Sequence, residues 1–181
     1  MKEKIDKYFD HVESIAGREG AFFRMENDPK IIVSSYVDVP EAGCLTAFSF
    51  GLSLADCKEW RYSKPELVIS MDSTDIAWAL AMGELVRCGW GRCLFSYGEV
   101  LDFGRQISEE SDMSAFLVFA SSSLEVSDLR VDLDDWIVNI SQIYPVHKQE
   151  VSLIREIGAE RFFYDFNIDF FDPRRKPVLV V

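Results

Sequence analysis

The stretch Trp136–Phe166, with the sequence WIVNISQIYPVHKQEVSLIREIGAERFFYDF, decides the fold that we predict for this chain. Its first part, up to Tyr144, alternates with a period of two, which is typical of a strand. The row that we expect to face the core contains Trp136, Val138, Ile140, Gln142 and Tyr144. Pro145 lacks an amide hydrogen and favours an extended residue before it, so we expect the strand to end there and a helix to open at Val146.

The predicted helix after Pro145 carries a glutamate early on and apolar residues at helical spacing until Gly158. Its apolar positions are Val146, Val151, Leu153, Ile154 and Ile157. A second short helix is expected over residues 159–166. The whole stretch therefore predicts one strand that leads into two consecutive helices.

Patterns elsewhere in the chain predict the remaining elements. An amphipathic helix is expected at 2–16, and a hairpin of strands 21–26 and 31–36 around a turn at Asn27-Asp28-Pro29. The continuous apolar run Glu66–Met71 favours a central strand that is buried on both faces. Further elements are expected as strands at 44–52, 99–107 and 114–120, a helix at 76–88, and an acidic connector at 124–133.

These elements predict an α+β fold, in which three or four helices pack on a mixed, largely antiparallel sheet of six or seven strands. At 181 residues, the chain is expected to form a single domain over 1–181. Its core is expected at about 20–168, after the N-terminal helix 2–16. The segment 169–181 is expected to be a loosely held tail.

The central stretch also carries a family resemblance. An apolar strand that ends in a hydrophobic residue and proline, then a glutamate and a helix that closes on Gly-Ala-Glu, resembles the suppressor of fused family. The residues that carry it are Ile143, Tyr144, Pro145, Glu150, Val151, Ile157, Gly158, Ala159 and Glu160. Weaker echoes lie in Phe50-Gly51-Leu52-Ser53, in the strand Pro65–Ile69 and in the helix of Trp78. The resemblance covers about residues 31–170.

The resemblance implies a non-catalytic module that binds a protein partner. Small bacterial members of the family are regarded as immunity proteins, so it implies an antitoxin-type protein that neutralises a cognate toxin. A cytoplasmic regulator that sequesters a signalling or transcription partner is the alternative. Of the matched positions, Tyr144, Pro145, Glu150 and Gly158 are expected to be architectural.

Charge points to the kind of partner. The net charge is −12, and ten acidic but only two basic residues lie between Glu99 and Asp135. Such a field repels nucleic acid and anionic lipid and attracts a basic protein, here a basic toxin domain. The candidate partner-binding residues are Glu109, Glu110, Asp112, Asp128, Asp132, Asp134 and Asp135. Solvated surface loops carry acids of this kind as well.

The cysteines and the glycine-rich segment give no sign of a cofactor. Cys44, Cys57, Cys88 and Cys93 show neither a CxxC motif nor disulfide-framework spacing, so we expect reduced structural thiols and no metal site. The segment Gly89–Arg92 lacks the spacing of a phosphate-binding loop. With no membrane-length apolar run and no signal-peptide pattern, a cytoplasmic monomer or weak homodimer is expected.

One enzymatic alternative stays open at this point. Only His11 and His147 exist as histidine bases, and His147 lies three residues before Glu150. If both shared a helix face, the carboxylate would orient the imidazole for general-base catalysis. The alternative to a binding module is therefore a small hydrolase or transferase that uses His147 and Glu150.

Overall fold

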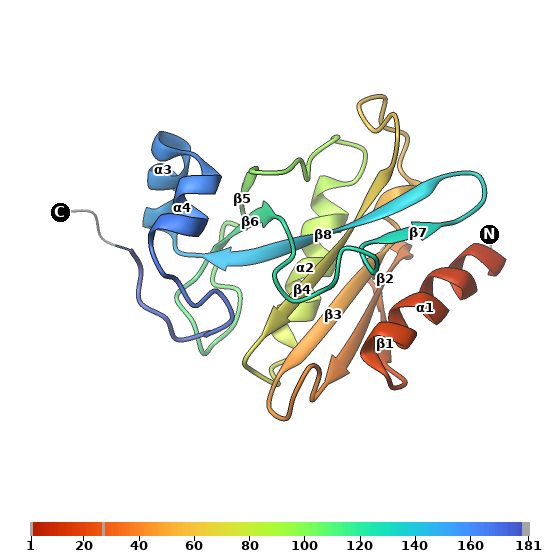
Figure 1. Cartoon of the computed structure of the whole chain (residues 1–181), viewed down its shortest axis with the longest axis horizontal. Helices are drawn as coiled ribbons and strands as arrows, with labels where there is room; N and C mark the ends of the chain where they lie inside the picture. The colour runs from red at the N-terminus through yellow and green to blue at the C-terminus, as the bar shows by residue number, and fades with distance from the viewer. Residues whose placement is uncertain (1, 27, 179–181) are drawn as a thin grey trace.

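The structure, a computed structural model, describes residues 2–26 and 28–178 (Figure 1). It contains four α-helices, one short 3-10 helix and eight strands over these residues. In chain order they are α1 (Lys2–Ala16), β1 (Ala21–Met25), β2 (Asp28–Val37), β3 (Leu45–Phe50), η1 (Leu52–Leu54), β4 (Lys64–Met71), α2 (Ala77–Gly89), β5 (Val100–Asp102), β6 (Ala115–Phe119), β7 (Arg130–Asp132), β8 (Ile137–Val146), α3 (Lys148–Ile157) and α4 (Ala159–Asp165).

The strands form one sheet in the order β1-β2-β3-β4-β8-β6-β5, and β7 also pairs with β8. All neighbours run antiparallel except β4 and β8. The predicted α+β class and mixed, largely antiparallel sheet are confirmed. The expected hairpin is formed by β1 and β2, although Asn27 of its turn lies outside the described residues. The predicted strand number is too low, because β7 lies inside the segment expected to be an acidic connector.

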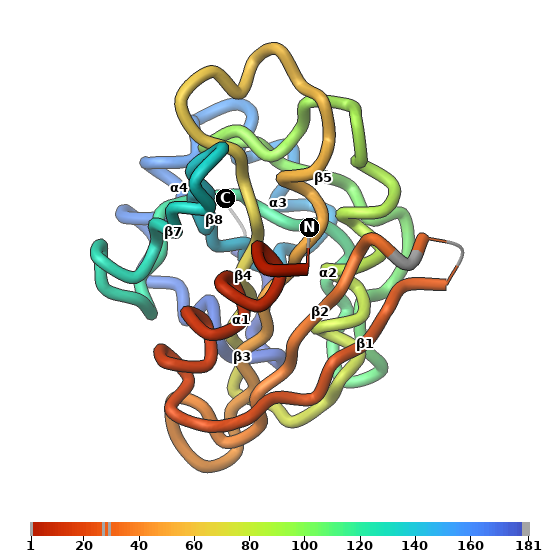
Figure 2. Tube along the Cα trace, turned by 90° about the vertical axis from the view of Figure 1, so that its right-hand side faces the viewer, coloured from red at the N-terminus to blue at the C-terminus, as the bar shows by residue number. Residues whose placement is uncertain are grey.

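Helices cover both faces of the sheet. Figures 1 and 2 place α1 and α2 on opposite faces, and α3 and α4 beside the end that carries β5 and β6. The α2 side buries Trp78 and Met82 against strand residues that include Ile69 and Phe116. The α1 side buries Tyr8 with Phe50. No described helix is long and apolar enough to span a membrane.

Strand β8 continues through Pro145, so the predicted strand end and the helix start at Val146 are wrong. Pro145 pairs with Phe116 of β6, and α3 begins only at Lys148. The Pro145 carbonyl points away from β6, since the Arg175 Nη2 donates to it over 3.2 Å. The missing amide hydrogen lies on that same side, where β8 pairs with β4 only up to Gln142. No sheet hydrogen bond is lost, so the proline is tolerated.

The segment after Asp169 is held in place up to Val178, so the expected loose tail is wrong for these residues. Phe170 and Arg175 are buried. The Asp72 amide donates to the Phe171 carbonyl over 2.9 Å, and the Val178 amide donates to Glu150 over the same distance. Residues 179–181 of the predicted tail lie outside the described residues.

Two cysteines form a disulfide, so the expectation of reduced thiols is wrong for this pair. Cys57 and Cys93 lie 36 residues apart, and their Cα atoms are 5.5 Å apart. Cys44 is a buried free thiol and Cys88 an exposed one. A disulfide is typical of an oxidising compartment. The disulfide thus gives no support to the predicted cytoplasmic location, which stays a prediction.

Candidate functional site

The structure divides the predicted acidic residues into two groups, one in the loop between β5 and β6 and one around β7, near opposite ends of strand β8 (Figure 1). Glu109, Glu110 and Asp112 lie in the loop between β5 and β6. The Glu110 carboxylate accepts hydrogen bonds from the Trp78 indole over 3.0 Å and from the Ser73 hydroxyl. Glu110 thus fixes this loop to the start of α2, while Glu109 and Asp112 are exposed.

The second group surrounds β7 and contains Asp128, Asp132, Asp134 and Asp135. Two of its carboxylates form ion pairs with α1: Asp134 with Lys7 over 2.9 Å, and Asp135 with Lys4. The hydrogen bond and charge of Lys4 lower the pKa of Asp135. These two acids attach the β7 turn to α1, which reduces the charge that they offer to a partner.

Of the family-motif residues, Tyr144, Pro145 and Glu150 are buried around the junction of β8 and α3, and Gly158 is exposed at the end of α3. The Tyr144 hydroxyl donates to the Ala120 carbonyl over 2.8 Å. Glu150 is fully buried and forms a salt bridge with Arg175 over 2.6 Å. Gly158, between α3 and α4, has a φ of 89°, a backbone conformation that residues with a side chain rarely adopt. Their contacts are those of residues that hold the fold.

His147 does not form the pair that the enzymatic alternative needs. Its backbone amide, not its ring, donates to the Glu150 carboxylate over 2.8 Å. The buried ring places Nε2 3.0 Å from the Arg175 carbonyl. Glu150 itself is engaged by the Arg175 guanidinium. This geometry orients the start of α3 and offers no exposed general base.

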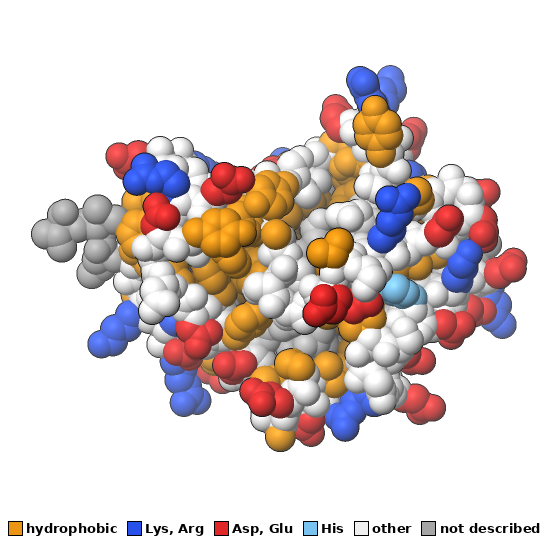
Figure 3. Space-filling view, viewed as in Figure 1, with side chains coloured by type: hydrophobic (Ala, Val, Ile, Leu, Met, Phe, Trp, Pro, Cys, Tyr) orange, Lys and Arg blue, Asp and Glu red, His pale blue; other side chains and the backbone are white. Residues whose placement is uncertain are grey.

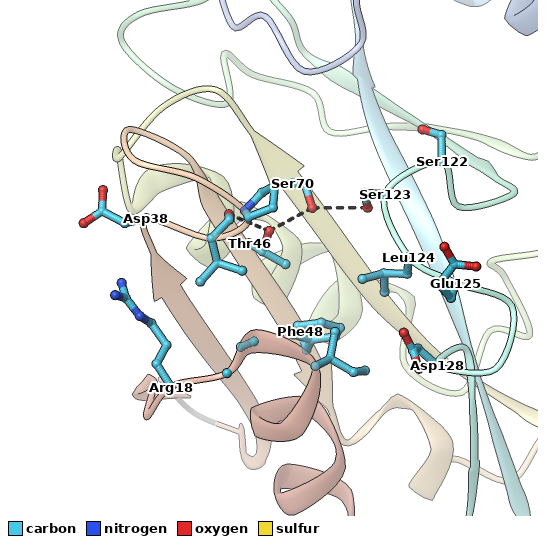
Figure 4. Close-up of a pocket in the computed structure, with 15 residues that line it drawn as sticks. Arg18, Asp38, Thr46, Phe48, Ser70, Ser122, Ser123, Leu124, Glu125 and Asp128 are labelled. Carbon is cyan, nitrogen blue, oxygen red and sulfur yellow. Dashed lines mark hydrogen bonds between the residues drawn. The ribbon is translucent and has the colours of Figure 1, made fainter.

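An open groove lies on the α1 face of the sheet, between the end of α1 and the segment 122–128 (Figure 4). Its volume is about 550 Å³. Three hydroxyls form its floor: Thr46 Oγ1 lies 3.0 Å from Ser70 Oγ, which lies 3.5 Å from Ser123 Oγ. We call this the hydroxyl groove. Its other lining residues include Phe48, Leu124, Arg18, Asp38, Glu125 and Asp128.

The chemistry of the hydroxyl groove suits binding. Its rim carries three carboxylates, Asp38, Glu125 and Asp128, and the Arg18 guanidinium donates to the Val37 carbonyl. Among the lining residues there is no histidine or cysteine that would serve as base or nucleophile. The Thr46 hydroxyl donates to the Val39 carbonyl and the Ser123 hydroxyl to the Gln142 side chain, each over 3.0 Å, so these two hydroxyls would meet a partner as hydrogen-bond acceptors.

An aromatic patch, made of Tyr97, Phe119, Phe163 and Tyr164, lies beside the groove. The Phe119 ring centroid lies 4.4 Å from that of Tyr97 and 4.6 Å from that of Phe163. Tyr97 and Tyr164 stay 58% and 69% exposed. Apolar side chains gather on this face beside α3 and α4 (Figure 3). Exposed tyrosines of this kind are enriched at protein–protein interfaces.

The two surfaces are connected by one chain segment. Phe119 ends β6 within the patch, and Ser122 and Ser123 follow it into the wall of the groove. Of the residues that form the groove and the patch, the sequence predicted only Asp128 as a binding residue. No local sequence pattern is formed by single hydroxyls on separate strands or by tyrosines in loops. The one signal of the groove in the sequence is that Thr46 and Ser70 are polar residues within apolar strands.

Comparison with known proteins gives one family. A family model for the suppressor of fused protein (SUFU) matches residues 27–176. The chain is similar in fold to a SUFU homolog from Neisseria gonorrhoeae, with 15% identity, a TM-score of 0.79 and 100% of both chains covered. No curated protein matches the chain.

Two further solved structures share the fold. One is a crystal structure of a Sufu–Fu complex, with 14% identity, a TM-score of 0.70, and coverage of 93% of this chain and 89% of that chain. The other is Drosophila Suppressor of Fused, with 14% identity, a TM-score of 0.71, and coverage of 96% of this chain but 50% of that chain. The chain thus corresponds in length to the bacterial homolog and to half of the Drosophila protein.

Proposed function

The chain belongs to the suppressor of fused family, and from this premise we propose that it is a non-catalytic module that binds a protein partner. One observation carries the proposal: an exposed aromatic patch adjoins a polar groove with acidic residues on its rim. Aromatic anchors supply most of the affinity at such surfaces, and the polar rim supplies orientation. A relative in a solved structure is in complex with Fu, which supports a binding role here.

We further propose that the partner is a basic toxin that this protein neutralises by stoichiometric binding. The net charge of −12 supports a basic partner, because opposite charge raises the association rate. Full coverage of the bacterial homolog supports the small single-domain type. Sequestration of a signalling partner is the alternative, and the identity of the bound protein distinguishes the two.

The experiment is affinity capture from the source cell at low and then high salt, followed by a binding titration with the captured protein. We expect one basic protein, bound in a 1:1 ratio and released as the salt concentration rises. The doubly substituted variant Tyr97→Ser/Tyr164→Ser should bind it about 30-fold more weakly, as for the loss of an interface hot spot. For the toxin proposal, co-expression should also suppress the growth arrest that the captured protein causes.

The matched control is Tyr62→Ser, because Tyr62 is 91% exposed but lies outside the patch and the groove. It should bind the partner as tightly as the native protein. Equal binding by native protein and the patch variant would exclude the patch as the interface. A captured partner that is chemically altered by catalytic amounts of this protein would refute the non-catalytic proposal.

A further inference from the structure

Strand β1 forms one end of the sheet, and among the described strands it pairs with β2 alone. Figure 2 shows it running along the outer side of the molecule, next to α1. Its five residues are exposed or half-buried, in contrast to the buried strand β3. An open edge presents backbone donors and acceptors to another strand. We call this the β1 edge.

On the α1 face, a groove of about 510 Å³ lies beside the β1 edge. Three acids line it from one flank of α1, namely Asp6, Asp10 and Glu13, and one base, Arg24, lines it from β1. None of these three acids forms an ion pair with another described residue. Phe22, which is 48% exposed, packs edge-on against Phe9 at its floor.

On the opposite face, a second groove of about 690 Å³ lies beside the same edge. Met25 and the α2 residues Leu80 and Ala81 give it an apolar part. The charged residues that line it are of both signs and include the paired Glu84 and Arg87. The β1 edge is therefore flanked by an acidic groove on one face and a partly apolar groove on the other.

We propose that the β1 edge binds an extended segment of the partner as an additional strand. Successive side chains of a strand point to opposite faces, so such a segment places alternate residues in the two grooves. Charge complementarity then requires lysine or arginine at positions toward Asp6, Asp10 and Glu13, with apolar residues between them. The inference rests on the proposed protein-binding function and specifies the partner: a basic chain with alternating basic and apolar residues over about five positions.

The test uses a capped seven-residue peptide of alternating lysine and valine, titrated into isotope-labelled protein and followed by amide NMR shifts. Saturable shifts are expected at residues 21–25 and along α1. A peptide with glutamate in place of lysine should not bind, because it faces the acidic groove. A lysine–valine peptide with alternate backbone nitrogens methylated should also fail, since it keeps the charges but cannot pair as a strand.

A second experiment neutralises the acidic residues of the protein instead of changing the peptide. The triple variant Asp6→Asn/Asp10→Asn/Glu13→Gln should bind the lysine–valine peptide about tenfold more weakly, as expected for three exposed charge pairs. The control variant Glu41→Gln/Asp56→Asn/Glu156→Gln changes the net charge equally at exposed residues outside both grooves, and should change affinity less than twofold.

Three results would overturn the proposal: no saturable shifts at residues 21–25, equal binding of the methylated peptide, or equal weakening by the control variant. The outcome is separable from that of the proposed function. If the captured partner binds the triple α1 variant as tightly as the native protein, the β1 edge is not its docking site, while protein binding itself stands. If no protein partner exists, peptide binding alone would not restore the proposed function.

Discussion

Replacement of Arg175 by methionine should destabilise the fold by leaving a carboxylate buried without its cation. Glu150 is fully buried and accepts four hydrogen bonds. Two come from the Arg175 guanidinium, at 2.7 and 2.6 Å, and two from the backbone amides of His147 and Val178, at 2.8 and 2.9 Å. Arg175→Met keeps much of the side-chain volume and removes the charge and two donors.

The magnitude follows from that geometry. Removal of one partner of a buried ion pair costs about 3–5 kcal/mol, because the remaining charge is desolvated. For a chain of this size, each kcal/mol lowers the melting temperature by about 2–4 °C, so a decrease of about 6–20 °C is expected. Arg174→Met is the matched control: Arg174 is the exposed neighbour, and its loss should cost less than about 0.5 kcal/mol.

The pH dependence provides the sharper test. Burial alone would raise the pKa of Glu150, but the hydrogen bonds and charge of Arg175, together with the amides of Val178 and His147, outweigh burial and hold the pKa below its ordinary value of 4.5. The native pair therefore stabilises the fold above that value, and this stabilisation is lost as the pH falls through the lowered pKa. In Arg175→Met, only the two backbone amides still oppose the effect of burial, so the pKa of Glu150 rises and the stability of the variant falls as the pH increases.

Urea denaturation of both proteins from about pH 4 to about pH 7 should show a deficit that grows with pH. The double variant Glu150→Gln/Arg175→Met removes the buried charge and should recover at least half of the loss. A deficit that is constant across this pH range, or below 1 kcal/mol at pH 7, would refute the reasoning.

Other variants test packing, buried charge and the disulfide. Gly83→Ala should cost about 1–3 kcal/mol in thermal unfolding, because its Cβ would lie 2.8 Å from a methyl carbon of buried Val33; unchanged stability would exclude the clash. Burial raises the pKa of Glu66 more than its hydrogen bonds lower it, so the stability deficit of Glu66→Gln should shrink from about pH 4 toward pH 7, because the carboxyl ionises in the unfolded chain while it stays protonated in the native protein; a growing deficit would contradict this. Reduction of Cys57–Cys93, which are 36 residues apart, should lower the free energy of unfolding by about 2–4 kcal/mol; an unchanged denaturation midpoint, or four free thiols in place of two in the unreduced protein, would exclude the bond.

Local sequence patterns predicted the strands and helices whose burial follows from the spacing of their own apolar residues. The apolar run Glu66–Met71 became β4, with β3 and β8 on its two sides, and the apolar helix pattern around Trp78 became α2. Val138 and Ile140 of β8 are buried as their alternation predicts. Periodicity is sufficient in these cases because burial on a given face follows from the repeat itself.

Contacts between distant residues set the features that the sequence did not predict. A proline ends a strand only where its missing amide would have paired with a neighbouring strand. At Pro145 that side of the strand faces Arg175, which lies 30 residues away and donates to the Pro145 carbonyl. The Cys57–Cys93 bond likewise depends on the approach of two loops. The hydroxyl groove joins Thr46, Ser70 and residues 122–128, so no window of sequence contains it.

The distribution of charge shows why a count of acids along the chain is a poor guide to a binding surface. The segment with the highest acid content places Asp134 and Asp135 against lysines of α1, where their charges are largely compensated. The same helix exposes Asp6 and Asp10 on another flank, and neither of them forms an ion pair with another described residue. Attraction of a basic partner is therefore expected from the acids that form no ion pair with another described residue, among them Asp6 and Asp10 beside the β1 edge and Asp128 and Asp132 around β7.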